Sequence, residues 1–284
     1  DIGLYQAKSS GRNQMCFFDP AMEETVTLQA QLANALHRAV QEQQFELYYQ
    51  IQVDSRNNPV GAEALIRWQH PQLGIVSPND FIPLAEASDL ILPIGRWVLE
   101  TACAQLKRWQ TNPRTYRLSV AINISPRQFH QSDFVATVLQ AIAKYAISPS
   151  SLKLELTETV ILDNTKVTVE KMQQLKQAGV EFALDDFGTG YSSLGYLTQL
   201  PLSQLKIDQS FVRNIGIKDS DDIIVQTIIA MAKSLGIKVI AEGVETEAQR
   251  IFLDELGCPL FQGYLFSKAV PVAEFEALLQ SGLK

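Results

Sequence analysis

The sequence predicts an α/β fold, a TIM-like (β/α)₈ barrel whose first strand runs antiparallel to the others. From Val60 onward, seven strand-like runs alternate with helix-like runs, which is typical of a parallel strand set covered by helices. One further strand-like run, from Phe45 to Val53, comes before them after only a short turn, which favours an antiparallel hairpin. A doubly wound open sheet is the alternative, but no glycine-rich phosphate loop follows the first strand.

The N-terminal residues form a unit too short to bury a core of its own. Residues 1–8 resemble a helix that ends at Gly11, and residues 14–18 could form a strand. The next stretch, from Pro20 to about Val40, has an apolar residue every four positions, which predicts a helix. We expect a remnant of another domain over residues 1–20, a connector helix over 21–42 and the main domain over 43–284. A plain amphipathic helix packed on the following residues has the same pattern as a connector.

The remaining elements follow in the order that a barrel requires. Ser77 and Pro78 form a typical helix start, and Gly179, Gly236 and Gly257 each follow a helix-like run where helices commonly end. Strands are predicted over residues 60–68, 117–123, 152–157, 181–185, 204–207, 238–241 and 259–262. Helices are predicted over residues 78–88, 93–110, 132–145, 166–178, 220–235, 246–256 and 272–281.

The composition excludes several classes of protein. The chain has 284 residues, 46% of them hydrophobic, which suits one large domain plus a fragment. Its net charge of −7 argues against a binder of nucleic-acid polymers. The three cysteines are far apart in the sequence, so neither a disulfide framework nor a zinc site is indicated, and we expect a cytoplasmic location. No membrane segment or signal peptide is visible in this chain, although its start without methionine indicates a piece of a longer protein.

Two adjacent acids, Asp185 and Asp186, follow a short apolar strand and precede a loop that contains Gly188 and Gly190. Neighbouring carboxylates repel each other unless a positive charge lies between them, and a divalent cation commonly supplies it. The glycines allow the backbone to turn sharply at this point. On these residues alone, an acidic turn that caps a helix through Asp186 or Ser192 is equally compatible.

Further polar residues lie at the ends of the other predicted strands, where the active sites of such barrels are found. These residues are Glu63, Arg67, Asn123, Glu155, Glu158, Lys206, Asp208, Glu242 and Gln262. Five acids, Glu63, Glu155, Asp185, Asp186 and Glu242, would repel one another strongly if they converged without a counter-charge. Oxygen ligands favour magnesium or manganese over zinc. Five acids exceed the needs of one ion, so a two-metal site for in-line attack at phosphorus is plausible. Pairing of some acids with Arg67 and Lys206 inside the barrel is the structural alternative.

The chain closely resembles the EAL-domain family of cyclic di-GMP phosphodiesterases. The resemblance is carried by seven motifs in order, namely Glu63 to Trp68, Asn123 to Ser125, Glu155 to Glu158, Asp185 to Gly190, Lys206 to Asp208, Glu242 to Glu245 and Gln262 to Tyr264. Residues 1–18 also resemble the last helix and strand of a GGDEF domain. The resemblance implies Mg²⁺- or Mn²⁺-dependent hydrolysis of cyclic di-GMP to linear pGpG, in a protein that forms a homodimer.

The resemblance also implies a role for individual residues. Glu63, Asn123, Glu155 and Asp185 would hold the first metal ion, and Asp185 and Asp186 the second. Glu242 would be the general base and Lys206 would position the water, so that these two residues and Glu63 form the catalytic set. The substrate would contact Gln50, Leu65, Arg67, Asp208 and Gln262. Glu158 would anchor the loop that follows Asp186.

Two positions depart from the family pattern, because Ile51 and Ala269 stand where proline is common. Both would lie at the rim of the ligand site and bear on affinity more than on chemistry. A catalytically silent receptor of cyclic di-GMP is the alternative function. A dimerising regulatory domain that binds no ligand is the third possibility. The histidines give no sign of a catalytic triad, and His70 is interpreted as a structural turn residue.

Overall fold

The computed structural model of the chain describes residues 20–162, 165–188 and 194–282. The predicted helix over 1–8 and the predicted strand over 14–18 lie outside the described residues, as does most of the loop after Gly188. The chain divides into two compact units, one made of residues 1–46 and 67–94 and the other of residues 47–66 and 95–284. The second unit holds most of the strands and, apart from Arg67, the polar residues predicted to form the site.

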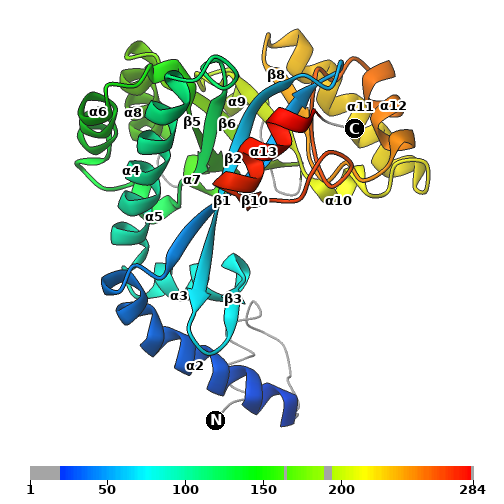
Figure 1. The fold of residues 1–284 in the computed structure, drawn as a ribbon. Helices are drawn as coiled ribbons and strands as arrows, with labels where there is room; N and C mark the ends of the chain where they lie inside the picture. Colours follow the sequence, from blue (N-terminus) through cyan, green and yellow to red (C-terminus); the bar gives the residue numbers. More distant parts are fainter. Residues whose placement is uncertain (1–19, 163–164, 189–193, 283–284) are drawn as a thin grey trace. The chain divides into compact units, whose positions relative to one another are not determined.

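Within the described residues, eight strands close into a barrel (Figure 1). Around it follow β1 (Phe45–Asp54), β2 (Pro59–His70), β4 (Ser119–Asn123), β5 (Leu152–Thr157), β6 (Glu181–Phe187), β7 (Gln204–Ile207), β8 (Lys238–Ala241) and β9 (Leu260–Gln262). From β2 to β9 every neighbouring pair is parallel, whereas β1 is antiparallel to β9 and also pairs with β2. The predicted barrel with an antiparallel first strand is confirmed, and the open doubly wound sheet is excluded.

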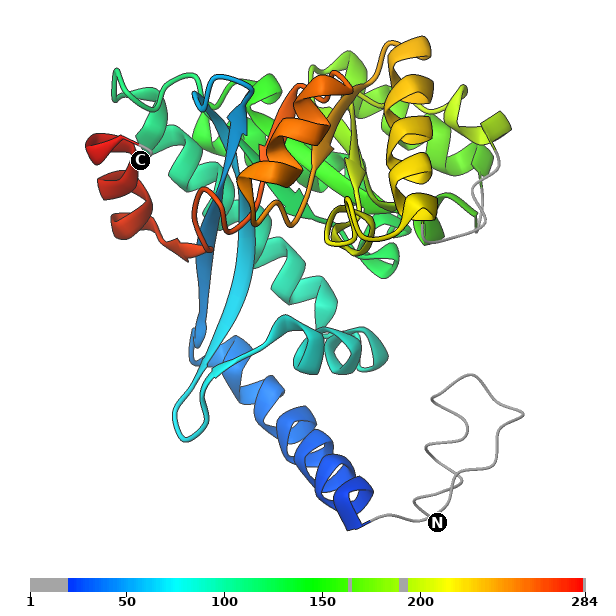
Figure 2. The same cartoon turned by 90° about the vertical axis from the view of Figure 1, so that its right-hand side faces the viewer.

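Long helices lie around these strands (Figure 2). They are α4 (Ile91–Gln110), α6 (Phe134–Tyr145), α8 (Thr165–Gln177), α11 (Asp219–Ser234), α12 (Glu247–Glu255) and α13 (Val272–Ser281). Each has a counterpart among the predicted helices. Helix α12 begins with a capping box, in which the side chain of Thr246 accepts from the backbone of Gln249 and the Gln249 side chain accepts from the backbone of Thr246.

The sequence patterns did not predict the short elements at the strand ends. Single helical turns follow four successive strands, as α5 (Pro126–Phe129), α7 (Glu158–Leu162), α9 (Leu194–Leu197) and α10 (Gln209–Val212). A 3₁₀ turn (Pro149–Ser151) and the two short strands β3 (Gly74–Val76) and β10 (Val270–Pro271) were missed as well. Elements this short have too few residues to show a hydrophobic period.

The barrel has an apolar outer face and a polar interior. Along β5, Leu152, Leu154 and Leu156 are completely buried on one face, while Lys153 and Glu155 are buried on the other. The interior also contains Glu63, Gln204, Lys206 and Gln262, all of them less than a tenth exposed. Because buried polar groups are costly unless they are paired, this interior needs hydrogen bonds or ions to be stable.

The first unit has its own apolar core. Helix α2 (Pro20–Gln41) buries Leu32, Leu36 and Ala39, and helix α3 (Pro78–Ala87) buries Phe81. The ring of Phe81 lies 5.7 Å from that of Trp68 in a T-shaped contact. At the end of β2, Nδ1 of His70 accepts hydrogen bonds from the backbone N–H groups of Gln72 and Leu73, so it serves a turn as predicted. Among the described residues, no helix combines the length and the apolar character needed to cross a membrane.

Candidate active site

The predicted site residues of the second unit gather at the C-terminal ends of the barrel strands. Glu63 lies in β2, Asn123 ends β4, Glu155 lies in β5, and Asp185 and Asp186 lie in β6. Lys206 lies in β7, Glu242 directly follows β8, and Gln262 ends β9. The parallel register places the side chains of neighbouring strands in common rows, with Asn123 opposite Glu155 and Lys206 opposite Ile240. The barrel topology thus brings together residues that are far apart in the sequence.

The ammonium group of Lys206 lies among four carboxylates. Its Nζ is 2.7 Å from Oε2 of Glu155, 2.7 Å from Oε1 of Glu242, 3.1 Å from Oδ1 of Asp185 and 3.4 Å from Oε2 of Glu63. The lysine side chain is only 1% exposed. Pairing of the acids with Lys206 was the predicted alternative to metal binding, and the structure contains these ion pairs. One positive charge cannot balance four carboxylates, so a strong attraction for further cations remains.

Two amide groups hold Glu63 in place. Nδ2 of Asn123 donates a hydrogen bond to Oε1 of Glu63 at 2.7 Å, and Nε2 of Gln262 donates one to Oε2 at 2.6 Å. Burial by itself would raise the pKa of Glu63, but Lys206 and these two amides hold it below its usual value. Glu63 is therefore an ionised carboxylate with a fixed orientation, and the amide of Asn123 is turned so that Oδ1 is its atom for a cation.

The other glutamates of the cluster lack comparable support. Burial raises the pKa of Glu155 well above its usual value despite the contact with Lys206, and the charges of Glu63 and Asp185 act in the same direction as burial. Burial likewise raises the pKa of Glu242 to about 8. The pKa of Lys206 is raised well above its usual value, because the surrounding carboxylates outweigh the effect of burial. Proton and metal ion consequently compete for these carboxylates.

The strand that carries the acid pair continues one residue beyond it, to Phe187. A bulge interrupts the pairing of β6 with β7 between Leu184 and Phe187, and Asp186 has a φ of 54°. The bulge turns both carboxylates toward the site, and the backbone N–H of Asp186 donates to Oδ1 of Asp185 at 3.0 Å. Burial and the charge of Asp185 raise the pKa of Asp186 to about 6. Asp186 is a strand residue, so the helix-cap interpretation is wrong for it, and Ser192 lies outside the described residues.

Two groups of carboxylates have the spacing of a metal site. Glu63, Glu155 and Asp185 form one group and Asp185, Asp186 and Glu242 the other, each with one ligand atom per residue within 4.8 Å of the rest. Oε1 of Glu155 is buried and has no hydrogen-bond partner among the described residues. A free buried carboxylate oxygen beside other acids suits a hard cation, and Asp185 belongs to both groups. The residues present therefore fit a metal centre.

A chain of glutamine side chains borders the carboxylates. Nε2 of Gln262 donates to Oε1 of Gln50 at 3.1 Å, and Nε2 of Gln52 donates to Oε1 of Gln262 at 2.9 Å. Nε2 of Gln50 donates in turn to the backbone oxygen of Ser267. Gln52, only 2% exposed, was not predicted as a site residue, although its alternation with Gln50 along β1 was a signal that could have found it.

Among the other predicted substrate contacts, Asp208 lies close to the acid pair, because its charge and a side-chain hydrogen bond help to raise the pKa of Asp186. Leu65 is half-buried in β2, on the same face of the strand as Glu63. Asp208 caps helix α10, where its side chain accepts from the backbone N–H of Ser210 at 3.0 Å. Arg67 belongs to the first unit.

Glu158 begins helix α7, directly after β5, and its Oε1 accepts a hydrogen bond from the backbone N–H of Gly188 at 3.3 Å. Gly188 follows the acid pair and has a φ of 99°, which strongly favours glycine. A Cβ atom at this position would lie 3.0 Å from Cε2 of Phe211, so space is lacking as well. Glu158 is therefore in contact with the segment that it was predicted to anchor.

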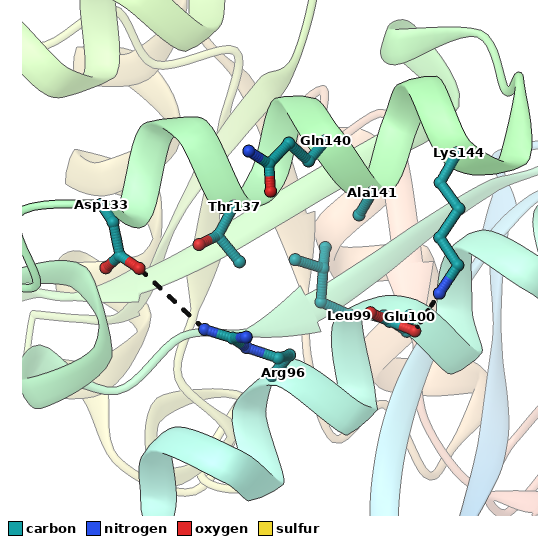
Figure 3. Close-up of a pocket in the computed structure, with 8 residues that line it drawn as sticks. All are labelled: Arg96, Leu99, Glu100, Asp133, Thr137, Gln140, Ala141 and Lys144. Atoms are coloured by element: carbon teal, nitrogen blue, oxygen red, sulfur yellow. Dashed lines mark hydrogen bonds and ion pairs between the residues drawn. The ribbon is translucent and has the colours of Figure 1, made fainter.

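A separate pocket lies between α4 and α6, away from the strand ends (Figure 3). Two ion pairs cross it, Arg96 with Asp133 at 4.0 Å and Lys144 with Glu100 at 2.6 Å. Because these charged groups are already paired and largely exposed, the pocket does not have the unbalanced charge of the barrel site.

Comparison with known proteins gives consistent matches. The EAL domain family matches residues 33–269. The bifunctional diguanylate cyclase/cyclic di-GMP phosphodiesterase MucR of Pseudomonas aeruginosa is 41% identical over 278 residues, 98% of this chain and 40% of that protein. The cyclic di-GMP phosphodiesterase PdeR of Escherichia coli is 37% identical over 284 residues, 100% of this chain and 43% of that protein. The chain thus spans less than half the length of these relatives.

Solved structures agree with these matches. A structure described as the PaMucR phosphodiesterase in complex with c-di-GMP superposes with a TM-score of 0.84 at 41% identity, covering 86% of this chain and 99% of that one. The EAL enzyme Bd1971 in its cAMP- and cyclic-di-GMP-bound form gives a TM-score of 0.86 at 37% identity, covering 97% of this chain and 73% of that one.

Proposed function

This chain belongs to the EAL-domain family, and we propose that it is a metal-dependent phosphodiesterase that hydrolyses one phosphodiester bond of cyclic di-GMP to give linear pGpG. The observation that carries the proposal is the complete cluster of Glu63, Glu155, Asp185, Asp186 and Glu242 around Lys206 at the strand ends. The names of MucR and PdeR, which refer to cyclic di-GMP phosphodiesterases, support the same reaction.

We assign the metal ligands to the two carboxylate groups that share Asp185. Glu63, Asn123, Glu155 and Asp185 would hold one ion, and Asp185 and Asp186 a second. The all-oxygen ligand set favours Mg²⁺ or Mn²⁺. When bound, such ions supply charge stabilisation for the in-line attack of water at phosphorus. The carboxylates and the orienting amides of Asn123 and Gln262 are the protein's contribution to holding them.

The remaining residues of the cluster act on protons and on the phosphate. Glu242 would accept the proton of the attacking water. Burial raises its pKa to about 8 in the metal-free chain, so it must first lose its own proton to act as a base. Lys206, whose pKa is raised well above its usual value by the surrounding carboxylates, remains an ammonium group. It offsets the negative charge that develops on the phosphate oxygens.

Five residues are assigned to substrate binding. Gln50 and Gln262 offer amide groups beside the metal ligands, and Leu65, Arg67 and Asp208 complete the set carried over from the family. Ile51 and Ala269, where the family often has proline, would change affinity more than rate. A homodimer, a cytoplasmic location and the division into a GGDEF remnant, a connector helix and an EAL domain remain predictions.

A product assay tests the proposed function. The purified chain is incubated with cyclic di-GMP and either Mg²⁺ or Mn²⁺, and the products are separated by chromatography. We expect pGpG with metal, and no product with EDTA or in Glu63→Ala. Glu247→Ala, which removes an exposed carboxylate paired with Arg250, is the matched control and should keep wild-type activity. Binding of cyclic di-GMP without any product would instead identify a silent receptor, and repeating the assay across protein concentrations would reveal a dependence on dimer formation.

A further inference from the structure

The barrel interior holds a second buried polar pair that the proposed reaction does not use. Nζ of Lys153 on β5 donates a hydrogen bond to Oε1 of Gln204 on β7. The two residues are only 7% and 2% exposed. Burying an ammonium group and an amide is costly, and an apolar pair of the same size would fill the space more cheaply. The pair therefore calls for an explanation in terms of its neighbours.

The strand register places this pair beside Glu155. Lys153 precedes Glu155 by two residues on the same face of β5, a separation of about 7 Å along the strand. Gln204 and Glu155 lie in one row of the barrel, because both are opposite Ala183 of the intervening strand β6. Only the methyl group of Ala183 stands between them in that row, so nothing bulky separates the amide from the carboxylate.

Two links cross β6 side by side. Lys153 reaches Gln204, and Glu155 reaches Lys206, whose Nζ lies 2.7 Å from Oε2 of the glutamate. Each link joins β5 to β7, and the second lies one pleat closer to the C-terminal ends of the strands. The Lys153–Gln204 link therefore lies next to the Glu155–Lys206 link, on the side away from the C-terminal ends of the strands.

The charges and hydrogen-bond groups of the pair are complementary to Glu155. Lys153 and Glu155 are both buried on the same face of β5, so the ammonium group lies near the carboxylate. Because Lys153 occupies Oε1 of Gln204, the amide orientation of Gln204 is fixed. Its Nε2 is buried and has no acceptor among the described residues. Oε1 of Glu155 is likewise buried without a partner, so an unused donor and an unused acceptor belong to residues on either side of Ala183 and do not bond to each other in this structure.

We propose that Lys153 and Gln204 are positioning residues that hold the carboxylate of Glu155 in the orientation needed to bind the metal ion. This inference rests on the proposed function, because it requires Glu155 to be a metal ligand. Groups behind a ligand commonly orient it, and losing them typically weakens metal affinity about 10- to 100-fold. Neither residue belongs to the set proposed for substrate binding or catalysis, so the chemical step should be largely preserved once the metal is bound.

The test measures Mn²⁺ binding by calorimetric titration of the purified chain, together with the rate of pGpG formation as a function of Mn²⁺. For Lys153→Met and Gln204→Met we expect Mn²⁺ affinity to fall about 10- to 100-fold. The rate at saturating Mn²⁺ should change by no more than a few-fold. Gln105→Met is the matched control, because Gln105 is 6% exposed and donates to Glu276 at 3.2 Å, and this pair joins helices α4 and α13 instead of two barrel strands. It should keep wild-type affinity.

A double variant distinguishes an effect on metal binding from misfolding of the single variants. Lys153→Met with Gln204→Met removes both partners, so neither member of the pair is left buried without the other, and thermal unfolding in EDTA checks the fold of the double variant. A folded double variant with wild-type Mn²⁺ affinity overturns the inference, and so does loss of folding in all three variants, because the pair then serves the fold alone. If the wild-type chain itself binds no Mn²⁺, the proposed function fails rather than this inference.

Discussion

Nζ of Lys206 lies 2.7 Å from Oε2 of Glu155, and both side chains are buried inside the barrel. The same ammonium group also contacts Glu63, Asp185 and Glu242. In the proposed function, the lysine and the metal ion would share one set of carboxylates. The lysine holds the acids together before a cation arrives, and the acids that it leaves unbalanced attract that cation.

The first prediction concerns the loss of this shared ammonium group. Lys206→Met leaves four carboxylates close together without a positive charge, and removal of one partner of a buried ion pair costs about 3 to 5 kcal/mol. We expect the unfolding temperature in EDTA to fall sharply, and saturating Mn²⁺ to restore part of the loss. Formation of pGpG should be lost even where the fold is restored, because the phosphate charge is no longer offset.

Lys144→Met is the control for removing a lysine from an ion pair. Lys144 pairs with Glu100 at 2.6 Å, but its side chain is 56% exposed and solvent screens the pair. Its unfolding temperature and its activity should match those of the wild type. If Lys206→Met were equally harmless in EDTA, the role of Lys206 as the internal counter-charge would be wrong.

The second prediction separates the charge of Glu63 from its volume. Both carboxylate oxygens of Glu63 accept hydrogen bonds from amide N–H groups, of Asn123 and of Gln262. Glu63→Gln keeps the shape but turns an N–H₂ group toward one of these donors. We expect pGpG formation to fall about 100-fold or more, because a metal ion contributes several kcal/mol to catalysis and each 1.4 kcal/mol is tenfold in rate. Mn²⁺ titration should show the accompanying loss of affinity, whereas Glu247→Gln at the surface should change neither.

The fold could be predicted from the sequence because its dominant signals are local. The leucines of β5 and the helix-ending Gly179, Gly236 and Gly257 give the alternation of strands and helices, and the short turn before Val60 indicates the antiparallel first strand. The single-turn helices after β4 to β7 could not be predicted, since one turn has no period. The bulge at Asp186 also escaped prediction, because it depends on how β6 pairs with β7.

The sequence was sufficient to name most candidate site residues, but not to predict how they contact one another. Acids at strand ends can be read from the sequence once the barrel is assumed, as for Glu63 and Glu155. That Lys206 contacts four carboxylates, or that Asn123 and Gln262 fix Glu63, depends on the register and closure of the barrel. Lys153 and Gln204 were missed, although their alternation with Glu155 along β5 and with Lys206 along β7 was a signal that could have found them.

The third prediction concerns the pH dependence of the metal-free protein. Burial raises the pKa of Glu242 to about 8 from a usual value of 4.5, and burial with the charge of Asp185 raises that of Asp186 to about 6. Between about pH 4.5 and 8 the folded chain therefore holds protons that the unfolded chain has released. Stability from these groups is present at low pH and is lost as the pH rises through the folded pKa values. The unfolding temperature in EDTA should fall from pH 5 to pH 8.5.

Two comparisons check the origin of that slope. Glu242→Gln cannot release a proton at this position, so its unfolding temperature should depend less on pH across the same window. Saturating Mn²⁺ replaces protons at the carboxylates, so its stabilising effect should increase as the pH rises. A metal-free wild-type protein that becomes more stable between pH 6 and 8 would contradict the assignment of raised pKa values to this cluster.

The last prediction concerns the contact between Glu158 and Gly188. Oε1 of Glu158 accepts from the Gly188 backbone N–H at 3.3 Å, two residues after Asp186. Without this acceptor the backbone after β6 loses its hydrogen bond to α7. Among the proposed metal ligands, Asp186 is the nearest in sequence to that hydrogen bond. Glu158→Ala should therefore raise the Mn²⁺ concentration required for half-maximal pGpG formation about tenfold or more, as loss of a group behind a ligand typically does. Glu158→Gln retains a side-chain oxygen acceptor at the same position and should keep nearly the wild-type requirement. Equal behaviour of the two variants would show that the hydrogen bond to Gly188 does not control the metal site, since only one of them can form it.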